Sequence, residues 1–422
     1  MGVRNMLARA MKLIIKVPEV VAAARRFEQS PRDAMRELVS HTRAGFASML
    51  EQVMNAEIEL FLGQGAEREN KRNGFTSRTY AVKGIGAVRV KVPRDRDGRF
   101  NSNVVPPRRR YDEDLARDIA LLDLAGLSTR MVSHLSQRVL GMPVSPTEVS
   151  NALHQLVPGA KAFLNRRLDD RRFKYLYVDG TNFRVRRTTV ALEPTLVVVG
   201  VDEMHRKSVL AAVQGDKEKK STWAMVFHHL KERGLDASAV QLGVMDGLPG
   251  LADAFIEAFP AARVGRCWVH KATNVMPRVP KRYQAQFKLD WNAIQYAEGE
   301  AAARCAFGVL QARWSTVCPD AVDAIERDLG ALLMHYRFPR DHWEALRTTN
   351  PIERVNKEFK RRSKAMEVVS DNGLKVLLAF IALRLEYNWS TKPITNNGHV
   401  NLPQVRANRR QHLDAVTSSL VN

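Results

Sequence analysis

The chain has 422 residues and is strongly basic, with 66 Lys and Arg against 45 Asp and Glu and a formal net charge of +21. Such a charge predicts a polyanionic partner, a generally basic surface being the alternative. Three cysteines are too few for a disulfide scaffold and favour a reducing compartment. No apolar run reaches the roughly 18 residues of a membrane span, so we expect a cytoplasmic, nucleoid-associated protein without a membrane partner.

The first 66 residues are expected to form amphipathic helices, over 20–27 and 34–50, and to serve dimerisation. Met49, Val53, Ala56 and Leu60 recur at helical spacing and predict a packing seam. This seam would contact either a second subunit or the chain's own core.

Residues 67–111 predict a β-hairpin followed by basic loops. Apolar and polar residues alternate around Gly84 and Gly86, as is typical of a hairpin. Arg108 and Arg109 in the second loop are candidates for DNA phosphate contacts, or are simply solvated.

Residues 112–165 predict helices joined by short turns. Ser128 and Ser145 are candidate N-caps, and Pro146 and Glu148 complete the second helix start. Two short helices of this kind resemble a helix-turn-helix that would read DNA, although plain structural hairpins have the same pattern.

Residues 166–275 predict a mixed sheet with helices on its faces, because strands come first in succession and then alternate with helices. The expected strands are 175–178, 183–187, 195–201, 209–213, 241–245 and 262–266, and the expected helices are 219–233 and 248–258. Residues 276–346 predict an inserted helical subdomain. Residues 347–395 would complete the core, and 396–422 would form a tail.

Asp179 and Asp246 each come near the end of an apolar strand and are each followed by Gly. Because carboxyl ends of strands carry the sites of open α/β sheets, the two carboxylates are expected to converge. Oxygen ligands favour Mg²⁺ or Mn²⁺, and two such ions are common where phosphodiesters are cut and joined.

Glu353 opens a strongly basic helix, where it either caps the helix after Asn350 or serves as a third metal ligand. The cations of this helix are candidates for DNA contacts: Arg354, Lys357, Lys360, Arg361 and Lys364. Glu358 is interpreted as a salt-bridge partner, and Asp202 and Glu203 as exposed residues of a hairpin turn.

Cys267 and His270 form a CxxH pair that lacks the second half of a zinc site. His270 either lies near the scissile phosphate or is a buried, hydrogen-bonded histidine. Trp291, Trp314 and Trp343 are ordinary core residues or rings on which a base pulled from DNA would stack.

Six segments together resemble Mutator-type transposases of bacterial insertion sequences, from about residue 70 to residue 389. They are RNGFTSRT (72–79), VPRDRDGRF (92–100), YVDGT (177–181), MDGLPGL (245–251), RCWVHKATNV (266–275) and RTTNPIER (347–354). Residues 366–373 depart from the pattern, since they lack the aromatic-Pro-Asn turn that the family resemblance implies.

The resemblance implies a ribonuclease-H-like α/β core interrupted by a helical insertion. It also implies an Asp-Asp-Glu triad of Asp179, Asp246 and Glu353 that binds two Mg²⁺ or Mn²⁺ ions, with the CxxH motif at Cys267 and His270. The implied activity is cleavage at the terminal inverted repeats of the element and strand transfer into target DNA, carried out by a homodimer. A related nuclease and a non-catalytic DNA-binding protein are the alternatives.

Overall fold

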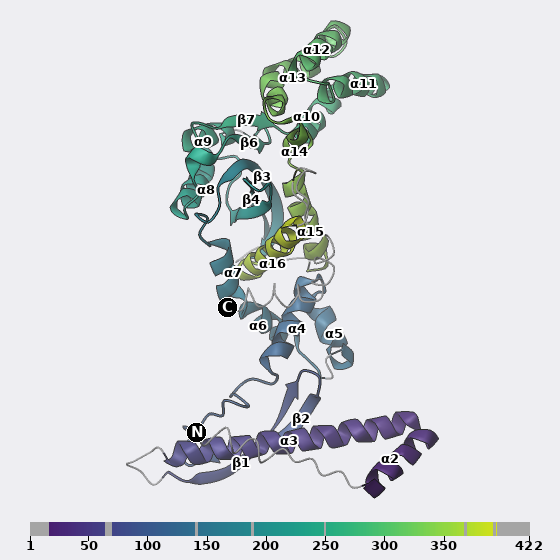
Figure 1. The fold of residues 1–422 in the computed structure, drawn as a ribbon, viewed down its shortest axis with the longest axis vertical. Coiled ribbons are helices and arrows are strands. Elements are labelled where there is room, and N and C mark those ends of the chain that lie inside the picture. The colour runs from purple at the N-terminus through teal and green to yellow at the C-terminus, as the bar shows by residue number, and fades with distance from the viewer. Residues whose placement is uncertain are drawn as a thin grey trace. The chain divides into compact units, whose positions relative to one another are not determined.

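The computed structural model describes residues 17–63, 70–139, 142–186, 190–248, 250–366, 369–390 and 394. The chain divides into two compact units. The first comprises residues 1–119 and 130–146, and the second comprises 120–129 and 147–422 (Figure 1).

The first unit combines long helices with a two-stranded hairpin. Its elements are α2 (Val17–Gln29), α3 (Pro31–Gly63), β1 (Arg72–Val82), β2 (Gly86–Asp95) and α5 (Thr129–Val139), and α4 (Glu113–Leu124) begins in it. The antiparallel pairing of β1 with β2 confirms the predicted hairpin. Gly84 and Gly86 have φ values of +82° and +87°, a region that favours glycine, which is why the chain turns there.

Helix α3 packs on the hairpin through one face. Met54 contributes to a core with Tyr80, Val88 and Val90, and Leu50 is partly buried against it.

The predicted seam of α3 lies on a different face of this helix. Met49, Val53 and Leu60 are exposed by 41%, 36% and 59%. Packing of the seam in the chain's own core is therefore ruled out among the described residues, and packing against a second subunit stays a prediction.

The second unit contains the mixed sheet that the sequence predicts, and the sheet has six strands. Its strands are β3 (Phe173–Arg186), β4 (Val190–Asp202), β5 (Lys207–Gln214), β6 (Leu242–Met245), β7 (Arg263–Arg266) and β8 (Val369–Ser370). The order is β5-β4-β3-β6-β7, with β8 pairing beside β3. Strands β3, β6 and β7 run parallel, whereas β4 is antiparallel to both β3 and β5.

Helices cover the sheet on both sides (Figure 1). On one side, α8 (Lys220–Glu232) and α9 (Leu251–Ala258) bury an apolar core that includes Val178, Phe227 and Phe255. On the other, α15 (Asn350–Met366) and α16 (Asp371–Ser390) pack against β3. The alternation of side chains along β3 serves both layers.

The elements between β7 and α15 are all helical. They are α10 (Trp268–Val275), α11 (Gln284–Gln295), α12 (Glu300–Trp314), α13 (Pro319–Leu332), α14 (Trp343–Leu346) and four short 3₁₀ turns. Two further helices, α6 (Pro146–His154) and α7 (Val157–Leu164), come before the sheet in the chain. Trp291 and Trp314 are 2% and 4% exposed and belong to the core of these helices. Burial there leaves neither ring free to stack on a base, whereas Trp343 is half-buried.

Two expectations about local structure are wrong. The strands predicted at 175–178 and 183–187 are one continuous strand, because β3 keeps its pairing with β4 through Gly180. Asp202 is buried rather than exposed, since its carboxylate accepts hydrogen bonds from the backbone N and Nε of Arg206. Glu203 is exposed, as predicted.

Within the described residues, none of the helices has the length and apolar character that crossing a membrane requires.

Candidate active site

Asp179 lies on β3, and Asp246 directly follows β6, the parallel neighbour of β3. The pairing of β3 with β6 ends at Val178 opposite Met245, and each aspartate is the next residue in its strand's direction. Asp179 is therefore in the middle of β3 rather than at its end, contrary to the prediction, but it lies where β3 loses β6 as a neighbour. This end of the parallel pairing brings the two carboxylates together.

His270, in the first turn of α10, joins the two aspartates. One donor atom from each of Asp179, Asp246 and His270 lies within 4.8 Å of the other two. Among the described residues this group has the donor chemistry and spacing to hold a divalent cation, because carboxylate oxygens are the preferred ligands of Mg²⁺ and Mn²⁺. The donor set fits the ion that the sequence predicts.

The electrostatics of the group differ from residue to residue. Burial, reinforced by Asp246, raises the pKa of Asp179 to about 6, although His270 opposes this shift. The pKa of His270 is raised to about 9, first by its hydrogen bond with Cys267 and further by the charges of Cys267, Asp179 and Asp246. The imidazole is therefore a cation at neutral pH beside two carboxylates.

Two cationic residues that the sequence did not single out border this group. A Cβ on Gly180 would lie 2.7 Å from the side chain of Lys217, whose charge lowers the pKa of Asp179. Arg266 donates from Nη1 to the backbone oxygen of Asp246 at 2.8 Å. Lys217 lies in a charged loop with no motif, so no sequence signal could have identified it.

Glu353 lies in the first turn of α15 and is half-buried. It is not a member of the group of donors that Asp179, Asp246 and His270 form. The helix begins at Asn350, one residue before the start that a cap at Asn350 predicts, and the Glu353 backbone N donates to the Thr349 oxygen at 3.1 Å.

Glu358, one turn further along α15, is the salt-bridge partner that the sequence predicted. It pairs with Arg354 at 3.1 Å, with Arg361 at 2.9 Å and with Arg362 at 2.5 Å. Arg362 is 1% exposed and also donates to the Leu124 oxygen, so it anchors the helix. The sequence pattern did not indicate a role for this buried arginine.

The other predicted DNA-contact residues are mostly on the surface. Lys357 and Lys360 are exposed, and the side chain of Lys364 lies outside the described part of the structure. Arg109 pairs with Glu113 at 2.9 Å, and Arg108 is exposed with a φ of +65°.

A mixed α/β sheet with two carboxylates and a cationic imidazole at the end of its parallel strands, in a strongly basic chain, is consistent with an enzyme that acts on nucleic acid. Residues 16–392 match the family model described as "Transposase, Mutator family". The chain therefore belongs to the Mutator family of transposases.

Two similar proteins are named as transposases of insertion sequences. The transposase for insertion sequence element IS905 of Lactococcus lactis subsp. lactis (strain IL1403) is 30% identical over 363 residues, 84% of this chain and 91% of that protein. The transposase for ISRM5 of Rhizobium meliloti (strain 1021) is 28% identical over 402 residues, 92% of this chain and 96% of that protein. A chain of the solved simian T-cell lymphotropic virus intasome in complex with PP2A regulatory subunit B56 gamma matches this protein at 16% identity. The match covers 51% of this chain and 65% of that chain. Its TM-score of 0.18 is too low to indicate a shared fold.

Proposed function

We propose that this protein is a DNA transposase that binds the terminal inverted repeats of its insertion sequence, cleaves at the element ends and catalyses strand transfer. The observation that carries the proposal is the group of Asp179, Asp246 and His270, whose donor atoms lie within 4.8 Å of one another. The family to which the chain belongs supports the reaction class.

The strand arrangement supports a ribonuclease-H-like core. The order is β5-β4-β3-β6-β7, in which β4 alone runs opposite to the other strands, and the first long strand, β3, lies at the centre of the sheet. The helices between β7 and α15 then form an insertion that separates Glu353 from the two aspartates in the chain.

In this proposal Asp179, Asp246 and Glu353 hold two Mg²⁺ or Mn²⁺ ions. When bound, such ions polarise a phosphodiester and lower the pKa of a bound water. His270 is a cation at neutral pH. In its protonated form it would donate a hydrogen bond to a phosphate oxygen, and Glu353 would supply the third carboxylate.

The DNA would be held by surfaces beyond this group. The formal charge of +21 supports a large phosphate footprint. We assign phosphate contacts to Arg108 and Arg109 in the first unit and to the basic residues of α15, which are Arg354, Lys357, Lys360, Arg361 and Lys364. We assign recognition of the repeats to residues 112–165. The exposed seam of α3 supports a homodimer, because joining two ends needs two copies.

The test of this function is cleavage and joining of a labelled duplex that carries the terminal repeats flanking the gene. Glu353→Gln is expected to bind the repeats and to lose both reactions, whereas Glu344→Gln, at an exposed position on α14, keeps them. Cleavage without preference for repeat ends would instead indicate a nuclease. Tight end binding without chemistry in the wild type would indicate a binding protein.

A further inference from the structure

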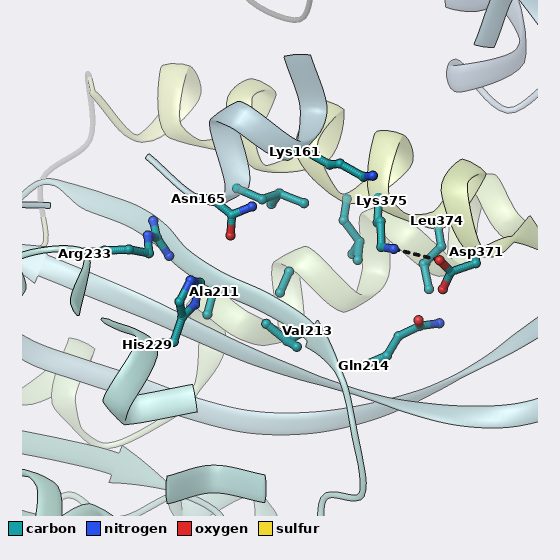
Figure 2. A pocket seen from close by; sticks show the side chains of 13 residues that line it. Lys161, Asn165, Ala211, Val213, Gln214, His229, Arg233, Asp371, Leu374 and Lys375 are labelled. Atoms are coloured by element: carbon teal, nitrogen blue, oxygen red, sulfur yellow. Dashed lines mark hydrogen bonds and ion pairs between the residues drawn. The ribbon is translucent and has the colours of Figure 1, made fainter. Parts of the chain in front are cut away.

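A cavity of about 640 Å³ lies in the second unit, beside β5, the edge strand of the sheet (Figure 2). Neither Asp179 nor Asp246 lines it. Its walls come from the end of α7, the end of α8, the first turns of α16 and the last residues of β5. Leu164, Ala211, Val213, Leu374 and Leu378 form the apolar part of the lining.

Three pairs of polar side chains, each four residues apart at a helix end, line this cavity: Lys161 and Asn165, His229 and Arg233, and Asp371 and Lys375. Arg233 and His229 lie near one end, and Lys161 and Lys375 near the other (Figure 2). Residues four apart lie on the same face of a helix, so each pair presents both side chains to one side.

Arg233 is the buried cation of the cavity. It is 5% exposed, and it donates from Nε to the Arg166 oxygen at 2.8 Å and from Nη1 to the Leu210 oxygen at 2.7 Å. Its Nη2 is buried without a hydrogen-bond partner. Arg166, whose carbonyl accepts from Arg233, pairs through its own side chain with Glu386 at 2.7 Å. Arg233 itself has carbonyl partners but no carboxylate partner among the described residues. A buried cation in this condition is stabilised by an anion.

The remaining charges also leave the cavity positive. Asp371 is paired with Lys375 at 2.7 Å. Lys161, Asn165 and His229 lie around the same space, and their side chains make no hydrogen bond or ion pair with any residue of the described ranges. Donors therefore approach from three helix ends, and the lining also includes the paired carboxylate of Asp371 and the amide of Gln214.

We propose that this cavity binds a phosphate group. A phosphate presents three or four acceptor oxygens, which suits donors on separate helices, whereas a carboxylate presents two oxygens in one plane. The volume exceeds that of a phosphate alone, and the apolar lining suits an attached sugar or base. The guanidinium of Arg233 supplies the fixed charge, and Lys161 supplies a mobile one.

The phosphate has two possible sources, a DNA backbone or a free phosphate compound. Across the sheet, Asp179 pairs with Val197 and Val197 pairs with Ala212, which lines the cavity. Strand spacing of about 4.8 Å places β5 roughly 10 Å from β3 at that level. A DNA strand bound near Asp179 is therefore within reach of the cavity, and the inference holds without the proposed metal chemistry.

The first experiment measures the melting temperature of the full chain in sodium phosphate, and in sodium chloride and sodium acetate of equal ionic strength. We expect a phosphate-specific rise in the wild type. The rise shrinks in Lys161→Gln and in Asn165→Asp, which change exposed side chains and leave Arg233 in place. Lys288→Gln, an exposed lysine of α11 outside the cavity, keeps the rise. A rise of equal size in all variants, no phosphate-specific rise, or an equal rise in acetate would overturn the proposal.

The second experiment identifies the source by measuring duplex DNA affinity over a salt series. If the cavity holds a backbone phosphate, Lys161→Gln lowers the slope of log K against log salt by about 0.9 relative to Lys288→Gln. If it holds a free phosphate compound, the two slopes agree while the thermal effect of Lys161→Gln persists. Because neither experiment requires cleavage, failure here is distinct from failure of the proposed transposase reaction.

Discussion

The thiol of Cys267 accepts hydrogen bonds from both the backbone N and the Oγ1 of Thr349, each at 3.4 Å. Next to it, the Trp268 backbone N donates to the Arg347 oxygen at 3.0 Å. His270 follows Cys267 by three residues and Glu353 follows Thr349 by four. The contact therefore joins the two segments that carry the separate parts of the proposed site, and it gives the CxxH motif a structural role that needs no zinc.

Loss of this thiol should impair catalysis more than folding. Cys267→Ala removes the acceptor of both Thr349 hydrogen bonds, and we expect cleavage of a repeat-end duplex to fall on the order of 10-fold to 100-fold, as a misplaced catalytic group predicts. Cys267→Ser retains an acceptor and should recover much of the rate at unchanged DNA affinity.

Cys318→Ala is the matched control for this series. Cys318 is also buried, at 4% exposed, but packs in the core of the inserted helices. Cys318→Ala removes the same volume as Cys267→Ala but affects no contact with Thr349. Equal rate losses in the two variants would therefore contradict a positioning role for Cys267.

The ion pairs of Glu358 predict a strong effect on stability. Glu358→Gln leaves Arg362, which is 1% exposed, without its counter-charge, and the free energy of unfolding should fall by about 3–5 kcal/mol. Arg354→Ala removes an exposed partner of the same carboxylate and should cost about 1 kcal/mol or less. Urea denaturation of both variants measures the difference, and similar losses would refute the account of Arg362 as the anchor.

Asp123 predicts a pH-dependent stability. Burial raises its pKa to about 6, and the side chain is 3% exposed with Oδ1 unpartnered. Because the folded-state pKa lies above the unfolded value of 3.8, the folded protein holds this proton more tightly. Ionisation of Asp123 should therefore lower the free energy of unfolding as the pH rises from about 4 to 6, and the total loss should be about 3 kcal/mol. Asp123→Asn should raise the melting temperature at pH 7 and show a shrinking gain towards pH 4. An equal gain at both pH values would show that ionisation of Asp123 is not the cause.

Gly243 on β6 tests the packing beneath the site. A Cβ at this position would overlap the ring of Phe255, so Gly243→Ala should destabilise the second unit by about 1–3 kcal/mol. In contrast, Gly308 on α12 has nothing within 4 Å of a built Cβ, and Gly308→Ala should stabilise by about 0.5–1 kcal/mol. Thermal unfolding of the two variants should shift in opposite directions, and a shift in the same direction would count against this packing.

The sequence predicted the mixed sheet and the convergence of Asp179 with Asp246, because strand periodicity and the sites of α/β sheets follow general rules. It did not predict that β3 continues through Gly180, since an Asp-Gly pair is equally typical of a turn. Lys217 and Arg362 were also missed. Their roles depend on neighbours distant in the chain, which local spacing does not reveal.

Mg²⁺-dependent cleavage and joining of a repeat-end duplex by the wild type, Asp246→Asn and Asp253→Asn tests most directly whether Asp246 belongs to the active site. Asp253 is an exposed aspartate of α9, seven residues further along the chain. We expect Asp246→Asn to bind the duplex with wild-type affinity or better and to lose both reactions, while Asp253→Asn retains them. Cleavage by Asp246→Asn at the wild-type rate would contradict the assignment of this carboxylate to the active site.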